Sequence, residues 1–163
     1  MATKRAFYAI KLSRTETMLT VIGVPDVPGM AARLFSALAD AKIPIVMVVQ
    51  NAPDAGSAAI TFTVWKQNAD AAHDIVRAKA EELGAEGLMR DDHIARLAVR
   101  GTELDKAVGL AGAFFTLLAD HGINVLAINT TTDLVSCIIE EVHSDVAVEI
   151  LKKKFDLTVE SPS

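Results

Sequence analysis

The sequence has few residues that could support covalent or metal chemistry. It contains a single cysteine, Cys137, so no disulfide can form within the chain, which predicts a reducing compartment such as the cytoplasm. None of the four histidines has the spacing of a metal site: His73, His93, His121 and His143. No Ser-His-Asp set and no phosphate-binding glycine loop is visible. We therefore predict no metal, no cofactor and no catalytic residue in this chain.

Long apolar runs and concentrated charge are also missing. No apolar run approaches the roughly 20 residues that span a bilayer, so no membrane partner is expected. The basic start, Met1–Ser13, lacks the apolar stretch and the cleavage site of a signal peptide. The net charge is −5 and the basic residues are dispersed, so no nucleic-acid partner is expected. What remains, 51% hydrophobic and 23% charged residues, is typical of soluble globular proteins.

The chain of 163 residues, long enough for one ordinary domain or two small ones, contains an internal repeat. The stretches that begin at Gly29 and Gly109 both read Gly-x-Ala-x-x-x-Phe-x-x-Leu-Ala-Asp-x-x-Ile. Their offset of about 80 residues is longer than the period of a solenoid. It predicts a small domain that is present twice.

Both copies predict the same order of elements. A strand, at 18–24 or 94–101, precedes a helix whose apolar residues recur at i, i+3, i+4 and i+7. An apolar strand, an alternating strand and a second helix follow, with Asn68 and Ser144 in position to cap the second helices. A last strand completes each copy. This order predicts the α+β class, with two ferredoxin-like βαββαβ units, each an antiparallel sheet with helices on one face.

Three segments complete this scheme. The last strands are expected at 86–92 and, more briefly, at 157–161. The alternating segment 6–13 has no helix of its own, and we expect it to add a strand to the sheet of the second unit. Cys137 falls in a predicted inner strand, which favours a small core residue over a nucleophile.

The corner Pro25-Asp26-Val27-Pro28-Gly29, between the first strand and the first helix, is a candidate ligand site. The amides of the first helical turn have no partners within the helix and carry the positive end of its dipole, which suits a carboxylate. Asp26 stands beside them and could accept an ammonium group. The pattern is therefore consistent with a site for a free amino acid. It is also consistent with ordinary turn chemistry, in which Asp26 caps the helix.

The stretch "VIGVPDVPGMAARLFSALADAKIPIVMVVQN" resembles the first ACT domain of the regulatory half of aspartokinase. The segments "ITFTV", "DDHIARLAVRG" and "VSCIIEE" resemble later parts of the same region, so the resemblance spans residues 7–157. It implies that residues 18–92 form one ACT domain. Residues 1–17 and 93–163 would form the second, with the N-terminal strand completing its sheet.

The resemblance also implies a function. Aspartokinase phosphorylates aspartate, and its paired ACT domains bind lysine or threonine and mediate feedback inhibition. A chain that covers this region alone is similar to the β subunit that joins a catalytic α subunit, and a homodimer paired through ACT domains is expected. The alternative is a free-standing tandem-ACT sensor that controls another protein, similar to glycine-cleavage repressors.

Carried over by position, the effector site of the first domain has four residues. Asp26 would take the amino group of the ligand, and the backbone of Gly29 and Ala31 would meet its carboxylate. Gln50 matches a glutamine at the end of the next strand.

In the second domain, Asn124 and Val125, with Ile123 close by, match the entry of a strand that faces a partner domain. Other positions depart from the family. The segment 102–110 has lost the proline and aspartate of the corner, 129–136 reads "NTTTDLVS", and Val46 replaces a frequent aspartate. These departures leave open whether a second site exists, and whether lysine, threonine or both are bound.

Overall fold

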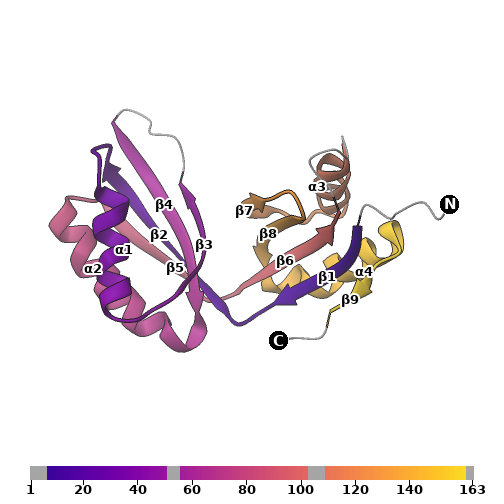
Figure 1. The fold of residues 1–163 in the computed structure, drawn as a ribbon, viewed down its shortest axis with the longest axis horizontal. Helices are drawn as coiled ribbons and strands as arrows, with labels where there is room; N and C mark the ends of the chain where they lie inside the picture. Colours follow the sequence, from indigo (N-terminus) through magenta and orange to yellow (C-terminus); the bar gives the residue numbers. More distant parts are fainter. Residues whose placement is uncertain (1–6, 51–55, 103–108, 161–163) are drawn as a thin grey trace. The chain divides into compact units, whose positions relative to one another are not determined.

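The computed structural model describes residues 7–50, 56–102 and 109–160, which form two compact units (Figure 1). The inner unit spans Thr15–Asp92. The outer unit combines the chain up to Arg14 with the chain from His93 onward. The inner unit is therefore an insertion in the sequence of the outer unit. Within the described residues no helix is long and apolar enough to span a membrane.

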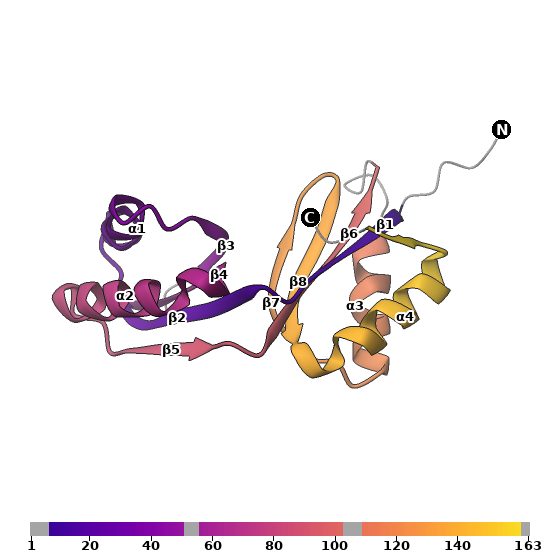
Figure 2. The same ribbon diagram turned by 90° about the horizontal axis from the view of Figure 1, so that it is seen from below.

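The inner unit has the predicted βαββαβ order, with a four-stranded antiparallel sheet in the order β3-β4-β2-β5. Figures 1 and 2 show both of its helices on one face of this sheet. Its elements are β2 Glu16–Pro25, α1 Met30–Asp40, β3 Ile45–Gln50, β4 Ser57–Trp65, the 3₁₀ turn η1 Lys66–Asn68, α2 Ala69–Leu83 and β5 Gly87–Asp91.

The core of the inner unit lies between the sheet and its two helices. The predicted apolar stripe of α1 buries Leu34 and Leu38, and α2 contributes Val76. Phe35 packs edge-on against Phe62 of β4, with 5.4 Å between ring centroids. This packing fixes α1 over β4 and so places the start of the helix at one end of the sheet.

The outer unit repeats this plan with one added strand. Its sheet has the order β7-β8-β6-β1-β9, and α3 and α4 pack on one face around Phe114, Leu118 and Leu151. Its elements are β1 Phe7–Ser13, β6 Ile94–Gly101, α3 Leu110–Asp120, β7 Val125–Thr130, β8 Leu134–Glu140, the 3₁₀ turn η2 Glu141–His143, α4 Ser144–Phe155 and β9 Thr158–Val159.

The segment expected to join the second sheet forms β1, but it is not an edge strand. It pairs antiparallel with β6 and parallel with β9, and so separates the first and last strands of the repeat. Ile10 of β1 is fully buried in the core. With only two residues, β9 is too short to cover β6, and β1 provides the missing partner.

Some local expectations were wrong. Asn68 stands at the N-cap of α2 but its side chain makes no capping bond. Ser144 is the first residue of α4 instead of its cap, and its hydroxyl donates to the carbonyl of Glu141 at 2.7 Å. β2 begins at Glu16, two residues before the predicted start. The expectation for Cys137 is confirmed, because it is buried in the core and burial raises the pKa of its thiol to about 12.

Candidate functional site

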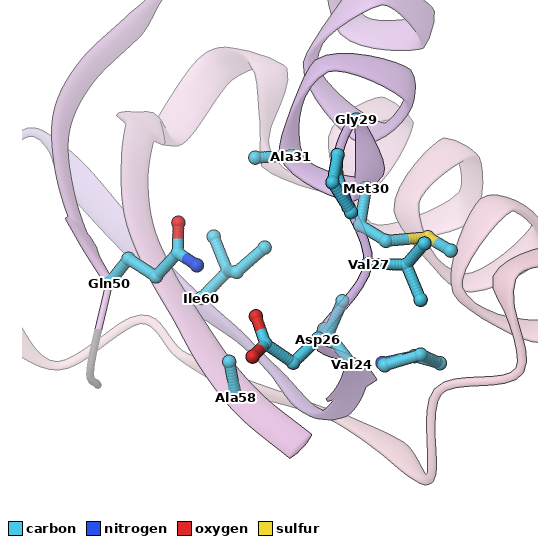
Figure 3. A pocket seen from close by; sticks show the side chains of 11 residues that line it. Val24, Asp26, Val27, Gly29, Met30, Ala31, Gln50, Ala58 and Ile60 are labelled. Carbon is cyan, nitrogen blue, oxygen red and sulfur yellow. The ribbon is translucent and has the colours of Figure 1, made fainter. Parts of the chain in front are cut away.

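A hollow of the inner unit lies at the corner where β2 meets α1 (Figure 3). It has a volume of about 420 Å³. It brings together the four residues that the resemblance assigned to the first domain: Asp26, Gly29, Ala31 and Gln50. Its other lining residues are Val24, Pro25, Val27, Pro28, Met30, Ala58 and Ile60.

Backbone hydrogen bonds hold the corner in place. The amide of Asp26 donates to the carbonyl of Gly56 at 3.0 Å, which ties the corner to the start of β4. The amide of Val27 donates to the carbonyl of Pro25 at 2.8 Å and closes a tight turn. Gly29 then adopts a left-handed backbone, with φ of 93°, and its carbonyl accepts the first helical bond, from Arg33 at 2.9 Å. The corner therefore has a defined shape.

The start of α1 has no side-chain cap among the described residues. The amides of Ala31 and Ala32 have no backbone acceptor there, and the amide of Met30 reaches the carbonyl of Val27 only at 3.4 Å. Asp26 thus does not act as a cap, which was the alternative reading of this corner. Free amides at the positive end of the helix dipole can accept a carboxylate.

Two polar side chains face the same space. Figure 3 shows the carboxylate of Asp26 and the amide of Gln50 both directed into the pocket, from the corner and from the end of β3. Buried Val24, Ala58 and Ile60 supply an apolar floor. Of the described residues that line the pocket, Asp26 alone is ionisable. The arrangement can hold an ammonium group at Asp26, a carboxylate at the helix start, and a short side chain over the floor.

The three residues assigned to the second domain do not line this pocket. All three lie at the entry of β7 in the outer unit, where Ile123 is buried in the core. The amide of Ile123 donates to the carbonyl of Leu118 at 3.0 Å, Asn124 is exposed, and Val125 is half-buried. The corner of the second copy falls at 103–108, outside the described residues, which therefore do not test whether a second site exists.

The apolar floor of the pocket and the left-handed residue in β2, Gly23, were not predicted from the sequence. Ile60 could have been found, because the alternation of Ile60, Phe62 and Val64 places all three on one face of β4. Gly23 gave only a weak signal, since an isolated glycine in a strand has several explanations.

Known proteins resemble this chain in sequence. A family model for the ACT domain matches residues 19–79 and 97–155. The aspartate kinase of Pseudomonas fluorescens (strain SBW25) is 36% identical over 148 residues, which cover 91% of this chain and 36% of that protein. The aspartokinase of Mycolicibacterium smegmatis is 36% identical over 146 residues, 88% of this chain and 35% of that protein. The chain therefore spans about a third of the length of these curated relatives.

Solved structures resemble it over nearly their full length. A crystal structure of aspartokinase alpha and beta subunits contains a chain that is 32% identical to this one, with a TM-score of 0.87. The match covers 93% of this chain and 100% of that chain. The ligand-free regulatory subunit of aspartate kinase from Thermus thermophilus has a TM-score of 0.87 and 28% identity, over 92% of this chain and 99% of that one.

The two matched segments fall on the two ferredoxin-like units, and together they define a protein of tandem ACT domains. The chain belongs to the ACT domain family, within the group formed by the regulatory ACT domains of aspartokinases.

Proposed function

We propose that this chain is the effector-binding part of an aspartokinase, in which lysine, threonine or both mediate feedback inhibition of aspartate phosphorylation. The effector binds in the pocket at the β2–α1 corner. It is a free amino acid, and the chain requires no cofactor of its own. Catalysis is supplied by an aspartokinase catalytic subunit or domain, and the regulatory domains pair as a homodimer.

One observation carries the proposal: the carboxylate of Asp26 stands beside the uncapped start of α1. A negative group and a set of free amides at one pocket complement both charges of a zwitterion. Gln50 offers an amide to the polar part of a side chain, and the floor of Val24, Ala58 and Ile60 excludes water from its apolar part.

Inhibition follows from linkage. A bound amino acid can shift an aspartokinase towards an inactive state only through a higher affinity for that state. The corner suits this role because it joins the first strand of the sheet to a helix, and its position depends on few bonds: the amide of Asp26 to Gly56 and the turn at Val27. A ligand that bridges Asp26 and the helix start would hold these parts at a fixed separation.

The first test is a melting screen of the chain with lysine, threonine, methionine, glycine and nucleotides. A ligand at 100 times its dissociation constant stabilises the folded state by about 2.7 kcal/mol, which raises the melting temperature measurably. We expect lysine or threonine to do so. Stabilisation by nucleotides alone would contradict the proposal. Light scattering on the same samples tests the homodimer.

Asp26→Asn is the variant that tests the site. It removes the charge that pairs with the ammonium group, so the ligand dissociation constant should rise by about tenfold or more, while the melting temperature without ligand changes little. Asp40→Asn is the matched control, because Asp40 is an exposed carboxylate on the last turn of the same helix and does not line the pocket. Isothermal titration calorimetry provides the measurement. Equal losses in the two variants would contradict the assignment.

Activity assays separate the two functions considered. An aspartokinase that carries this region, or that co-purifies with this chain, should lose activity as lysine or threonine is added, and the Asp26→Asn variant should resist this inhibition. A chain that binds the amino acid but associates with no aspartokinase would instead be a free-standing sensor.

A further inference from the structure

Strand β2 carries a β-bulge directly before the pocket. Its register with β4 is regular from Glu16–Trp65 to Val21–Ile60, and the pairing resumes at Val24–Ala58. Between these pairs β2 advances by three residues and β4 by two, so β2 contains one extra residue. On its other side β2 pairs with β5 without interruption as far as Ile22–Gly87.

Gly23 is the residue that makes this bulge possible. Its φ of 67° lies in the left-handed region, which glycine adopts without the strain that a side chain adds. A Cβ atom on Gly23 would lie 2.3 Å from Cγ and 2.7 Å from Cβ of Glu86. The amide of Glu86 donates to the carbonyl of Ile22 at 2.9 Å, so the base of that side chain cannot move away freely.

The extra residue decides which face of the sheet Asp26 belongs to. Leu19 and Val21 point into the core, and regular alternation would next bring Gly23 to that face and Val24 to the opposite one. Because of the bulge, Val24 lies in the core and forms the pocket floor beside Ala58. Asp26, two residues further, follows on the face that carries the helices.

We propose that Gly23 is a positioning residue for the effector: its left-handed backbone absorbs the extra residue of β2 and so keeps Asp26 on the pocket face. This inference rests on the proposed function of the pocket. The outer unit offers a contrast, because β6 pairs with β8 without interruption from Ile94–Glu140 to Arg100–Leu134.

The test uses two changes at one position with opposite expected results. Gly23→Val disfavours the left-handed backbone and favours a regular strand, so the pairing slips by one residue and Asp26 turns to the other face. Deletion of Gly23 removes the extra residue itself. The pairs Val21–Ile60 and Val24–Ala58 then continue in one regular register, and Asp26 keeps its face.

Gly84→Val is the matched control for strain. Gly84 ends α2 with a similar φ of 76°, and a Cβ atom there would meet no described atom within 4 Å. It does not line the pocket. The substitution should lower stability through the same backbone strain and leave effector binding unchanged.

The measurement is calorimetric affinity of the full chain for threonine and for lysine, with melting curves to verify folding. For whichever amino acid the unmodified chain binds, we expect Gly23→Val to raise the dissociation constant by about tenfold or more, and the deletion and Gly84→Val to leave it within about threefold. Backbone NMR contacts between Val24 and Ala58 should persist in the deletion variant.

Two results would overturn the inference. One is a Gly23→Val chain that binds as well as the unmodified chain. The other is a deletion variant that unfolds or loses binding, because glycine would then contribute stability or a local contact instead of register. If Gly23→Val does not fold, the deletion variant decides alone. An unmodified chain that binds neither amino acid contradicts the proposed function itself, which distinguishes the two failures.

Discussion

At the scale of single residues, Lys42 occupies a backbone conformation for which the second copy of the repeat uses glycine. After α1, Lys42 has a φ of 57°, and after α3 the equivalent position is Gly122 with a φ of 69°. Both turns are closed in the same way, with the next residue donating to the helix carbonyl of Leu38 or Leu118. Lysine is sterically strained in this left-handed conformation, whereas glycine is not.

We therefore expect Lys42→Gly to raise the free energy of unfolding by about 0.5–1 kcal/mol. The reciprocal change, Gly122→Ala, should lower it by a similar amount. Urea unfolding followed by circular dichroism measures both. A Lys42→Gly chain that is less stable than the unmodified one would show that the lysine side chain makes a compensating contact.

The polar residues and the glycine of the candidate site could be predicted from the sequence better than the residues of its apolar floor. Asp26, Gly29 and Gln50 stand in a recognisable order along the chain, and all of them line the pocket. Val24, Ala58 and Ile60 come from strands whose pairing decides that they meet. Such partners depend on register, and a one-residue bulge at Gly23 is enough to change which of them share a face.

At the scale of elements, β1 is attached to the outer unit by its side chains as well as by its ladder. Arg14, at the end of β1, donates from Nε to the hydroxyl of Ser144 at 2.9 Å and pairs with Asp145 at 2.5 Å, at the start of α4. Ser144 is buried, whereas Asp145 is almost fully exposed. The bond to Ser144 therefore contributes more than the exposed ion pair.

Arg14→Ala should lower the free energy of unfolding by about 1–2 kcal/mol, because it removes the donors that reach a buried hydroxyl. Asp145→Asn, the control, should cost less than about 0.5 kcal/mol. Differential scanning calorimetry can compare the two variants. A larger loss from Asp145→Asn would mean that the exposed ion pair is the stronger attachment.

The order of elements in both units could be predicted because each copy repeats the same apolar periodicity. The place of β1 could not be predicted from its own sequence. An alternating strand shows that one face is buried, but not which strand lies beside it. The position of β1 depends on the short β9. Because the two residues of β9 cannot pair along the length of β6, the longer β1 lies between them. The missing side-chain caps at Asn68 and Ser144 also depend on neighbouring structure, because a 3₁₀ turn directly precedes both α2 and α4.

At the scale of the whole molecule, the two units differ in how they are assembled from the chain. The inner unit is continuous from Thr15 to Asp92 and has its own core, with every strand of its sheet inside that range. The outer unit needs β1 from one end of the chain and the elements after His93 from the other.

A fragment of residues 15–92 should therefore unfold cooperatively on its own, whereas a fragment of residues 93–163 should not. Removal of β1 takes Ile10 out of the core and leaves β6 and β9 without their shared partner. Thermal unfolding of both fragments, with the second repeated in the presence of a synthetic peptide of residues 1–14, measures this. A cooperative transition of 93–163 without the peptide would contradict it.

The central position of β1 also governs the sequence of events on the ribosome. Of the described strands β1 is made first, yet it is among the last to find its place, since its neighbours β6 and β9 emerge only after the whole inner unit has been made. During that interval its backbone amides and carbonyls have no ladder to join. Nascent chains should accordingly bind chaperones through the β1 segment until β6 and β9 have been synthesised.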